Sequence, residues 1–421
     1  MDKFVIRGGK KLSGEVDISG AKNASLALMP AALLASGKSI LYNTPELNDV
    51  YTMMKLLNHL GVRTSFKNHI LELDTKQIIS QVAPYEHVKK MRASVYVLGP
   101  LLTRFGNAKV SLPGGCAWGP RPINLHLEAL KKMGAEIDLV EGYIIAKSKK
   151  LQGAKINFDV SSVGATGNTL MAAVLAKGTT VINNAAMEPE ITNLAEFLVK
   201  MGAKIEGIGT STITIEGVDD LSSAEIDTIP DRIEAGTLLI AAAITGGNIT
   251  LKNISEKYIN SILLKIEDSG CNLKIHNNII KIATVDNRII PTDVTTSIFP
   301  GFPTDMQAQW TAYMCLADGV CTVTDSIYLD RFKHIPELIR LGADIQVNEN
   351  HAIIKGVHKL KGAKVMSTDL RASASLVLAG LAAEGVTEVL RVYHLDRGYQ
   401  KIEKKLKSLG AEIERVAGKE Y

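Results

Sequence analysis

The chain has 421 residues, of which 46% are hydrophobic and 22% charged, a composition typical of a globular protein with a large core. Its length predicts two or three domains. The net charge of +4 is too small to indicate a nucleic-acid or membrane-surface partner, and no basic tract carries interleaved aromatic residues.

No stretch of the sequence has the length of a membrane span. The longest apolar stretches, Leu26–Ala35 and Ala374–Ala383, hold about ten residues, whereas a span needs roughly 18. The N-terminal stretch MDKFVIRGGKKLSGEV is polar and has no apolar signal segment. The four cysteines lack the spacing of a disulfide framework. We therefore expect a cytoplasmic protein in which Cys271, Cys315 and Cys321, which have apolar neighbours, are buried.

In chain order, one element recurs six times: a helix end, a glycine and a strand. The glycines follow one another at spacings of 73, 68, 68, 72 and 68 residues. Each suits a position after a helix end that requires a positive φ angle. They are Gly61, Gly134, Gly202, Gly270, Gly342 and Gly410.

A second element recurs in the same phase: an apolar, alanine-rich helix that precedes a β-branched strand. Helices that are apolar on all sides are typical of a protein interior. We predict an α/β protein of six similar subdomains, three in each of two halves, with a break near Asp227–Pro230. The helix–strand segments are 24–40, 92–110, 167–182, 232–251, 306–323 and 371–389.

The starts of these apolar helices are polar. An aspartate at a helix start is explained by capping alone, so none of them indicates a site by itself. Cations are different, because the helix dipole disfavours positive charge at this end. If the starts converge on a cleft between the halves, that cleft would attract phosphates or carboxylates. The cations are Lys22, Arg92, Arg232 and Arg371.

Cys116 lies in a different setting from the other cysteines, in the glycine- and proline-rich segment PGGCAWGPRP at 113–122. This composition predicts a mobile lid over a site. Arg121 would lower the pKa of the Cys116 thiol if the segment folds back. The alternative is a loop cysteine of no consequence.

Other candidates are weaker when each is taken alone. Arg331 and Arg397 follow predicted strands, where a surface salt bridge is the commoner explanation. We interpret His126, His334 and His394 as structural. The sequence has no dinucleotide-binding glycine motif, no zinc-binding pattern and no complete phosphate-binding loop.

Taken together, the motifs resemble those of the enolpyruvyl transferases, and among them the UDP-N-acetylglucosamine 1-carboxyvinyltransferase family of early peptidoglycan synthesis. The resemblance runs from the first residues to about Ile413. It rests on GAKN at 20–23, MRAS at 91–94, PGGCAWGPRP at 113–122, SVGAT at 162–166, PDRIEAG at 230–236, FPTDMQAQ at 302–309, TDLRAS at 368–373 and HLDRGY at 394–399.

The resemblance implies two inside-out α/β domains, each of three subdomains, with the active site in the cleft between them. It places residues 22–229 in the first domain, which carries the Cys116 segment, and residues 1–21 with 230–421 in the second. The implied substrates are phosphoenolpyruvate and UDP-N-acetylglucosamine, without cofactor or metal, and fosfomycin is expected to modify Cys116.

The family's catalytic roles carry over to Cys116, Asp305, Lys22 and Arg397. Cys116 would donate a proton to C3 of phosphoenolpyruvate, and Asp305 would act as a base near the sugar hydroxyl. Lys22, Arg121 and Arg397 would surround the phosphate and carboxylate. The other implied substrate contacts are Asn23, Arg92, Pro122, Ile123, Asn124, Leu125, Ser162, Val163, Gly164, Asp231, Arg232, Glu234, Ile327, Arg331, Asp369 and Arg371.

Three positions depart from the family pattern. Asn124 stands where many relatives have aspartate near the uracil, Trp118 replaces an aliphatic residue, and Phe299 replaces a histidine of some relatives. Two other functions stay open at this point: the related shikimate-pathway transferase, which lacks the cysteine segment, and a non-catalytic nucleotide-sugar sensor.

Overall fold

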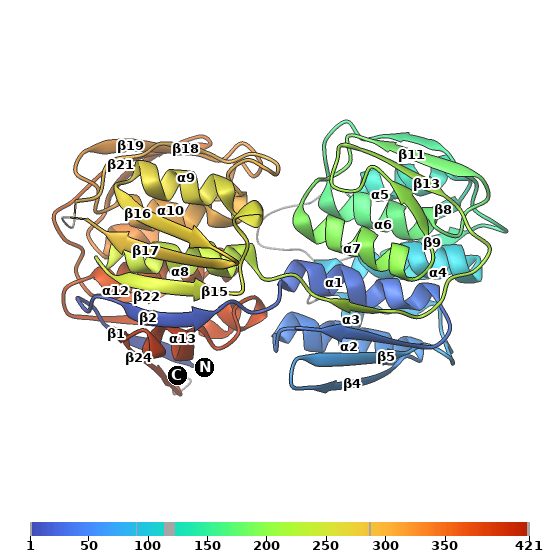
Figure 1. Cartoon of the computed structure of the whole chain (residues 1–421), viewed down its shortest axis with the longest axis horizontal. Helices are drawn as coiled ribbons and strands as arrows, with labels where there is room; N and C mark the ends of the chain where they lie inside the picture. Colours follow the sequence, from blue (N-terminus) through green and yellow to red (C-terminus); the bar gives the residue numbers. More distant parts are fainter. Residues whose placement is uncertain (1, 90, 113–122, 286–287, 419–421) are drawn as a thin grey trace. The chain divides into compact units, whose positions relative to one another are not determined.

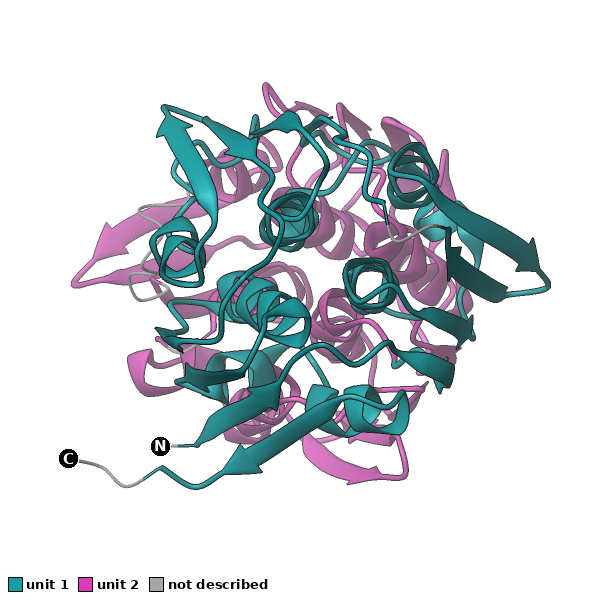
Figure 2. Cartoon of the chain, turned by 90° about the vertical axis from the view of Figure 1, so that its left-hand side faces the viewer, with its two compact units in different colours: residues 1–19, 230–421 teal, residues 20–229 magenta. Residues whose placement is uncertain are grey.

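The computed structural model describes residues 2–89, 91–112, 123–285 and 288–418. The chain divides into two compact units: unit 1 comprises Met1–Ser19 with Pro230–Tyr421, and unit 2 comprises Gly20–Ile229 (Figure 2). The chain crosses between the units at 19–20 and again at 229–230. The predicted break near Asp227–Pro230 contains the second crossing.

Unit 2 contains about half of the helices and strands of the described residues. Its helices are α1 (Lys22–Ala31), α2 (Asn48–Leu60), α3 (Tyr85–Val88), α4 (Leu98–Phe105), α5 (Asn124–Lys132), α6 (Val163–Ala173) and α7 (Pro189–Lys200), with 3₁₀ turns η1 (Ala32–Leu34) and η2 (Arg92–Val97). Its strands are β3 (Lys38–Tyr42), β4 (Arg63–Lys67), β5 (Ile70–Asp74), β6 (Val82–Ala83), β7 (Asn107–Ser111), β8 (Glu136–Val140), β9 (Tyr143–Lys147), β10 (Lys155–Asn157), β11 (Thr179–Asn183), β12 (Lys204–Glu206), β13 (Thr212–Glu216) and β14 (Glu225–Asp227).

Unit 1 takes its elements from both ends of the chain. Its helices are α8 (Arg232–Ile244), α9 (Asn260–Asp268), α10 (Gln307–Met314), α11 (Ile335–Arg340), α12 (Leu370–Ala382) and α13 (Ile402–Ser408), with 3₁₀ turns η3 (Glu256–Tyr258), η4 (Thr304–Met306) and η5 (Val392–Arg397). Its strands are β1 (Lys3–Arg7), β2 (Ser13–Asp17), β15 (Asn248–Lys252), β16 (Cys271–His276), β17 (Ile279–Thr284), β18 (Val294–Thr295), β19 (Val320–Thr324), β20 (Asp344–Asn348), β21 (His351–Lys355), β22 (Lys364–Met366), β23 (Val386–Leu390) and β24 (Glu412–Val416).

The strands of the described residues form six four-stranded sheets, one for each predicted subdomain. The order β10-β11-β13-β12 is typical: β10 and β11 are parallel, and an antiparallel hairpin completes the sheet. Within each unit the sheets lie outside and the apolar helices inside (Figure 1). The predicted α/β fold with buried helices is therefore confirmed.

Three of the sheets combine strands that are distant in sequence. In unit 2, β14 pairs in parallel with β3, so the last strand of the unit completes the first sheet. In unit 1, β1 pairs with both β23 and β24, and β2 pairs with β15. The sixth subdomain is thus completed by an N-terminal strand, which places residues 1–19 in unit 1.

The repeated glycines adopt the backbone conformation that their spacing predicted. Gly61 follows α2 with a φ of 108°, and its N–H donates to the carbonyl of Asn58. A side chain is strained in this left-handed region, so glycine ends the helix at low cost. All six repeated glycines have φ between 90° and 108°. The prediction of six helix ends is therefore confirmed.

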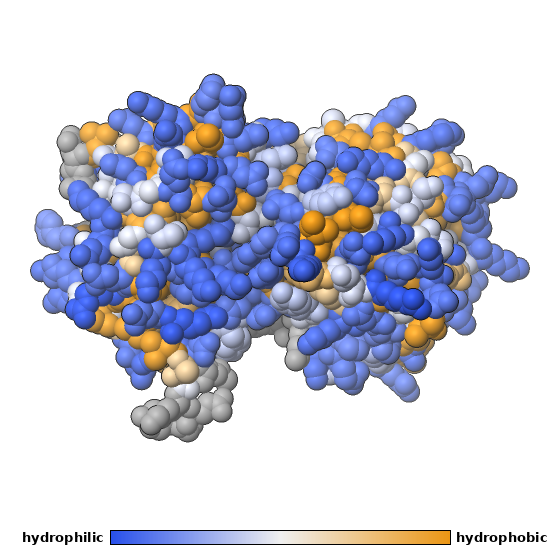
Figure 3. Space-filling model, turned by 60° about the horizontal axis from the view of Figure 1, so that its bottom comes forward, coloured by the Kyte–Doolittle hydropathy of each residue, from blue (hydrophilic) through white to orange (hydrophobic). Residues whose placement is uncertain are grey.

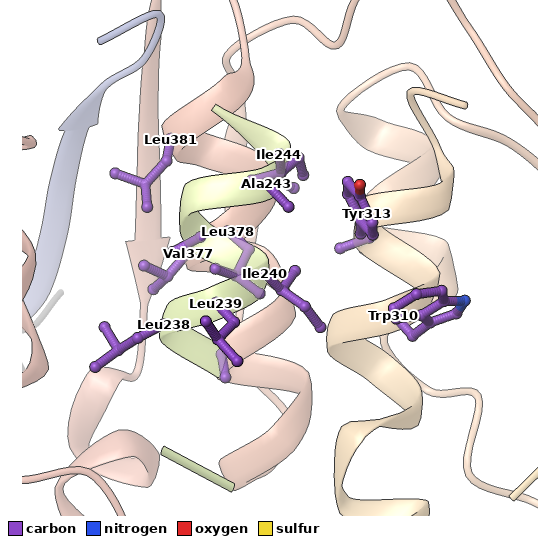
Figure 4. Close-up of a cluster of buried hydrophobic side chains, with 14 of the residues drawn as sticks. Leu238, Leu239, Ile240, Ala243, Ile244, Trp310, Tyr313, Val377, Leu378 and Leu381 are labelled. Carbon is purple, nitrogen blue, oxygen red and sulfur yellow. The ribbon is translucent and has the colours of Figure 1, made fainter. Parts of the chain in front are cut away.

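The core of unit 1 is built around α8, α10 and α12. Every residue of α8 except Arg232, and all eight residues of α10, are buried. Figure 4 shows Leu239 and Ile240 of α8 beside Leu378 of α12, with Trp310 of α10 on the neighbouring helix. Burying such a side chain contributes about 1.5–3 kcal/mol. The three helices are thereby fixed with respect to one another inside the unit.

Cys271, Cys315 and Cys321 are buried, as predicted from their neighbours. Hydrophilic residues cover most of the face shown in Figure 3, and hydrophobic patches lie between them. None of the helices within the described ranges combines the length and the apolar character that crossing a membrane requires.

Candidate active site

Three helix starts of unit 1 carry predicted site residues, and two of them are capped by aspartate. Asp231 accepts hydrogen bonds from the backbone N–H groups of Ile233 and Glu234, at 2.8 and 3.0 Å. Asp369 accepts from Arg371 N and Ala372 N, at 2.8 and 3.2 Å. Both caps satisfy amide groups that α8 and α12 would otherwise leave unpaired. Capping therefore accounts for one role of each aspartate.

Asp305 lies at the third start, in η4, and its carboxylate is held between two guanidinium groups. Arg331 Nη2 is 2.8 Å from Asp305 Oδ1, and Arg371 Nη2 is 2.6 Å from Oδ2. Burial alone would raise the pKa of Asp305, but the charges of Arg371 and Arg331 outweigh it and hold this pKa well below the usual range. Asp305 is therefore ionised at neutral pH.

Arg371 is itself almost enclosed, with 5% of its surface exposed. Burial opposes its charge, but the charge of Asp305 raises the pKa of the guanidinium overall, and Asp231 adds to this effect. Arg371 Nη1 also donates to the Tyr399 hydroxyl at 3.2 Å. The starts of α8, η4 and α12 thus meet around one buried cation.

Arg397 ends η5, which packs against the start of α12. A side chain at Gly398 would place its Cβ 2.5 Å from Leu370 Cδ2, so glycine permits this close approach. Burial lowers the pKa of His394, Asp369 opposes the shift, and Arg397 adds to it. Arg397 and Asp369 therefore lie in the same electrostatic neighbourhood of unit 1.

The other predicted residues of unit 1 divide between polar and aromatic contacts. The Arg232 guanidinium lies 5.6 Å from the centre of the Phe299 ring, which is a cation–π contact. Phe299 is one of the three residues that depart from the family pattern. Ile327 is exposed to 37% and follows Asp325, whose carboxylate accepts from Ile327 N at 3.0 Å.

Glu234 has a structural environment that its motif did not predict. Its carboxylate is 2% exposed and accepts from Lys405 Nζ at 2.9 Å and from Ser19 N at 2.7 Å. Burial raises the pKa of Glu234, although Lys405 and the backbone of Ser19 oppose the shift. The Glu234 carboxylate therefore forms an ion pair with Lys405 and a hydrogen bond with Ser19. These two contacts join α8 to α13 and to the N-terminal segment.

In unit 2, Lys22 begins α1 and lies near an acidic residue of α2. Its Nζ is 3.4 Å from Asp49 Oδ2, and the two side chains are 14% and 5% exposed. The carboxylate compensates a cation at a helix start, where the dipole disfavours it. Asn23, the next residue, is exposed.

A second group of unit 2 residues surrounds the start of α6. Ser162 caps the helix by accepting from Ala165 N at 3.3 Å. A Cβ on Gly164 would lie 3.0 Å from the His126 ring, so this glycine permits close packing. Burial lowers the pKa of His126 to about 4, and the charge of Arg92 adds to the shift. His126 is therefore neutral, in agreement with the structural role predicted for it.

The first turn of α5 contains three further predicted residues. Ile123 is the N-cap residue, and Asn124 and Leu125 follow it with exposed and partly exposed side chains. Cys116, Trp118, Arg121 and Pro122 lie outside the described residues. Within the residues that the structure describes, no group of three or more His, Cys, Asp or Glu side chains is arranged to hold a metal ion.

The predicted residues thus gather in separate groups in each unit. In unit 1, ion pairs link Asp305 to Arg331 and Arg371, and the charge of Asp231 acts on Arg371. In unit 2, Arg92 lies near the α6 start. Sequence reasoning missed the partners that hold these groups in place: Asp49, Thr237, Thr304, Gln309, Asp325, Tyr399 and Lys405. Thr304, Gln309 and Tyr399 lie within the quoted motifs, and this membership was the sequence signal that could have identified them.

Comparisons with known proteins agree with this architecture. The family model described as EPSP synthase (3-phosphoshikimate 1-carboxyvinyltransferase) matches residues 6–406. Among solved structures, the enolpyruvyl transferase NikO from Streptomyces tendae superposes with a TM-score of 0.89 at 23% identity, covering 99% of each chain. EPSP synthase from Acinetobacter baumannii gives 0.77 at 19% identity, covering 99% of this chain and 100% of that one. These two likenesses show the fold.

Relatives of much higher identity specify the family. A protein of Chloroherpeton thalassium is 59% identical over 100% of this chain and 99% of its own length. One from Chlorobium limicola is 58% identical over both full lengths, and one from Geotalea daltonii is 53% identical over 99% of this chain. All three are named UDP-N-acetylglucosamine 1-carboxyvinyltransferase. The chain therefore belongs to the enolpyruvyl transferases and, among them, to the UDP-N-acetylglucosamine 1-carboxyvinyltransferase family.

Proposed function

We propose that this enzyme transfers the enolpyruvyl group of phosphoenolpyruvate to the 3′-hydroxyl of UDP-N-acetylglucosamine and releases phosphate. The observation that carries the proposal is identity of 53–59% along essentially the whole chain with enzymes of that name. The product is the enolpyruvyl ether that begins peptidoglycan synthesis, and we propose that the reaction takes place in the cytoplasm.

The chemistry is an addition followed by an elimination. The sugar oxygen bonds to C2 of phosphoenolpyruvate, Asp305 accepts the hydroxyl proton, and Cys116 supplies a proton to C3. The tetrahedral intermediate then loses a C3 proton and phosphate, which restores the double bond. Because the two arginines lower the pKa of Asp305, its basicity is weak, and a transient proton-accepting and orienting role suits it better than a stable protonated state.

Phosphoenolpyruvate carries a phosphate and a carboxylate, so its site needs several cations. We assign this role to Lys22, Arg121 and Arg397. Lys22 lies 3.4 Å from Asp49, which supports the proposal because a lysine held at a defined place loses less side-chain entropy when it binds an anion. Arg397 is held on η5 against α12 by the close contact at Gly398.

The nucleotide sugar is assigned to residues from three segments of unit 2. The start of α6 offers backbone N–H groups at Ser162–Gly164, which suits a diphosphate. The residues from Arg121 to Leu125, together with Arg92, would hold the uridine and the sugar phosphates. Asn23 would contact the sugar. A neutral His126 next to Gly164 keeps the packing at this helix start compact without adding charge.

In unit 1, seven further residues are proposed to contribute to the sugar side of the reaction. Asp231 and Asp369 cap helices with their Oδ1 atoms, and Asp369 Oδ2 also accepts from the Thr368 hydroxyl at 3.1 Å. Arg331 and Arg371 act through Asp305, and Arg232, Glu234 and Ile327 complete the set that the motifs imply. We also propose that fosfomycin alkylates Cys116, because the thiol would open the epoxide and form a carbon–sulfur bond.

The test is phosphate release from phosphoenolpyruvate by the purified protein with alternative acceptors. We expect release with UDP-N-acetylglucosamine and none with shikimate 3-phosphate. Release with shikimate 3-phosphate alone would replace the proposal by the activity that the family model is named after. Release with neither acceptor, together with a melting temperature raised by the UDP-sugar, would instead identify a nucleotide-sugar sensor.

A further inference from the structure

We propose that Thr304 and Tyr399 are positioning residues for Asp305. Their hydroxyl groups accept hydrogen bonds from Arg331 and Arg371, the two arginines that bind the Asp305 carboxylate. This inference rests on the proposed function for its kinetic consequence. Its structural basis is a hydrogen-bonded network within unit 1, in which each arginine contacts Asp305 through one nitrogen and a hydroxyl through the other.

On the Arg331 side, the hydrogen-bond directions follow from the chemistry of the partners. Thr304 Oγ1 donates to Asp325 Oδ2 at 2.7 Å, and a carboxylate can only accept. Since the hydroxyl has a single hydrogen, Thr304 Oγ1 presents a lone pair to Arg331 Nη1, which donates at 2.9 Å. The other nitrogen of Arg331 reaches Asp305 at 2.8 Å. Thr304 thus sets the plane of the guanidinium.

Asp325 anchors this side of the network. Its side chain is fully buried and accepts from Thr296 Oγ1 at 2.8 Å as well as from Thr304. Backbone N–H groups of Ile327 and Tyr328 donate to it at 3.0 and 2.9 Å. A carboxylate with four donors has little freedom to turn, so the direction of the Thr304 hydroxyl is fixed as well.

On the Arg371 side, Tyr399 accepts a hydrogen bond from the arginine, as Thr304 does on the Arg331 side. Its hydroxyl accepts from Arg371 Nη1 and from Gln309 Nε2, each at 3.2 Å. Its hydrogen then points to Thr237 Oγ1 at 2.9 Å, because Thr237 donates its own hydrogen to the Ile233 carbonyl at 2.7 Å. The tyrosine is 1% exposed, and burial raises its pKa, so the phenol stays protonated.

The two sides together fix a carboxylate that the reaction needs in one orientation. Asp305 Oδ1 and Oδ2 each receive one guanidinium nitrogen, and each guanidinium is held by a second acceptor. A group that accepts a proton must lie within hydrogen-bond distance of it in the reactive complex. Releasing one guanidinium would let the carboxylate rotate away from that position.

The test on the Arg331 side compares Thr304→Val with Thr304→Ser. Valine keeps the shape but removes the acceptor, and we expect kcat to fall about tenfold or more, with KM for phosphoenolpyruvate changed less than about twofold. Serine keeps the hydroxyl and should restore most of the rate. Thr311→Val is the matched control, since the hydroxyl of this buried threonine donates to the Gln307 carbonyl of its own helix α10.

The test on the Arg371 side is Tyr399→Phe, with Tyr313→Phe as its control. Both tyrosines are buried in unit 1, but the Tyr313 hydroxyl contacts Ser269 and Cys271 instead of an arginine. We expect kcat to fall only in Tyr399→Phe. Equal losses in a variant and its control, at equal melting temperature, would overturn the positioning role.

Crystal structures of the Thr304 variants separate this inference from the proposed function. We expect Arg331 Nη2 to leave Asp305 in Thr304→Val and to stay within hydrogen-bond distance in Thr304→Ser. If the wild-type enzyme releases no phosphate with UDP-N-acetylglucosamine, the proposed function fails, and these structures still decide the inference. An unchanged Arg331 in Thr304→Val would overturn it whatever the kinetics show.

Discussion

The ammonium of Lys22 lies 3.4 Å from the carboxylate of Asp49, so the first residue of α1 is compensated by the first turn of α2. The pair keeps a cation at a helix start that would otherwise disfavour it. If Lys22 binds the phosphate of phosphoenolpyruvate, Asp49 stabilises the charge of Lys22 at the start of α1 when no phosphate is bound.

Lys22→Met is expected to lower kcat/KM for phosphoenolpyruvate about 10- to 100-fold, because one charge-assisted hydrogen bond to the substrate is lost. Calorimetric affinity for the UDP-sugar should stay within about threefold, since that ligand is assigned to other residues. Lys38→Met is the control, because Lys38 makes an exposed pair with Glu72 in the same unit. An unchanged kcat/KM would remove Lys22 from the phosphate site.

Removing Lys405 is expected to destabilise unit 1 in a pH-dependent way. Lys405→Met leaves the Glu234 carboxylate buried without its cation, which costs about 3–5 kcal/mol at neutral pH. The folded-state pKa of Glu234 is already raised by burial, and it would rise further without Lys405. The loss of unfolding free energy in Lys405→Met therefore comes from the ionised form of Glu234. It is absent below the unfolded-state pKa of about 4.3 and grows as the pH rises.

Urea unfolding of wild type and Lys405→Met at several pH values measures this effect. The difference in unfolding free energy should be small near pH 4 and largest above neutrality. Lys407→Met, an exposed position on the same helix, should match wild type at every pH. A difference that does not vary with pH would mean that lost packing of the lysine stem, not the buried charge, causes the destabilisation.

Gly164→Ala is expected to raise KM for UDP-N-acetylglucosamine and to leave KM for phosphoenolpyruvate nearly unchanged. The new Cβ would lie 3.0 Å from His126 Cε1 and Nε2, so the ring or the start of α6 must move. In the double variant Gly164→Ala/His126→Ala the ring is absent and the methyl group fits. A double variant that loses as much as the sum of the single variants would contradict this packing explanation.

Fosfomycin is expected to add once per chain, at Cys116. Burial raises the pKa of Cys271, Cys315 and Cys321, the last to about 12, so these thiols are scarcely ionised at neutral pH. Intact-mass and peptide analysis should find one adduct in wild type and none in Cys116→Ser, which should also lose most of its turnover. An adduct on any of the three buried cysteines would show that unfolding, not site chemistry, governs the modification.

The sequence predicted those features that depend on local pattern. Gly61 and its five repeats were found because a positive φ angle after a helix strongly favours glycine. The buried helices were found because α8 and its counterparts are apolar on all sides. Asp231 and Asp369 were expected at helix starts, and the structure shows them as caps.

Features that depend on packing were not predictable in the same way. Glu234 and Lys405 are 171 positions apart, and no local pattern pairs them. The ion pairs of Arg331 and Arg371 with Asp305 likewise join three segments that are distant in sequence. Only the folding of unit 1 sets the relative positions of these segments. Two of the predicted helix starts, at Arg92 and near Asp305, are 3₁₀ turns that precede α4 and α10. The first turn of α4 contains Pro100, which suits a helix start.

The insertion of β1 between β23 and β24 has a consequence for biosynthesis. All strands of the unit 2 sheets lie within residues 20–229, so this unit has its complete set of partners when about half of the chain has left the ribosome. Residues 3–7 are made long before β23 and β24, and they find both neighbouring strands only after Val416 is made. Strand β1 is therefore among the last strands to reach its final place, and a chaperone that shields it would act until β24 has been made.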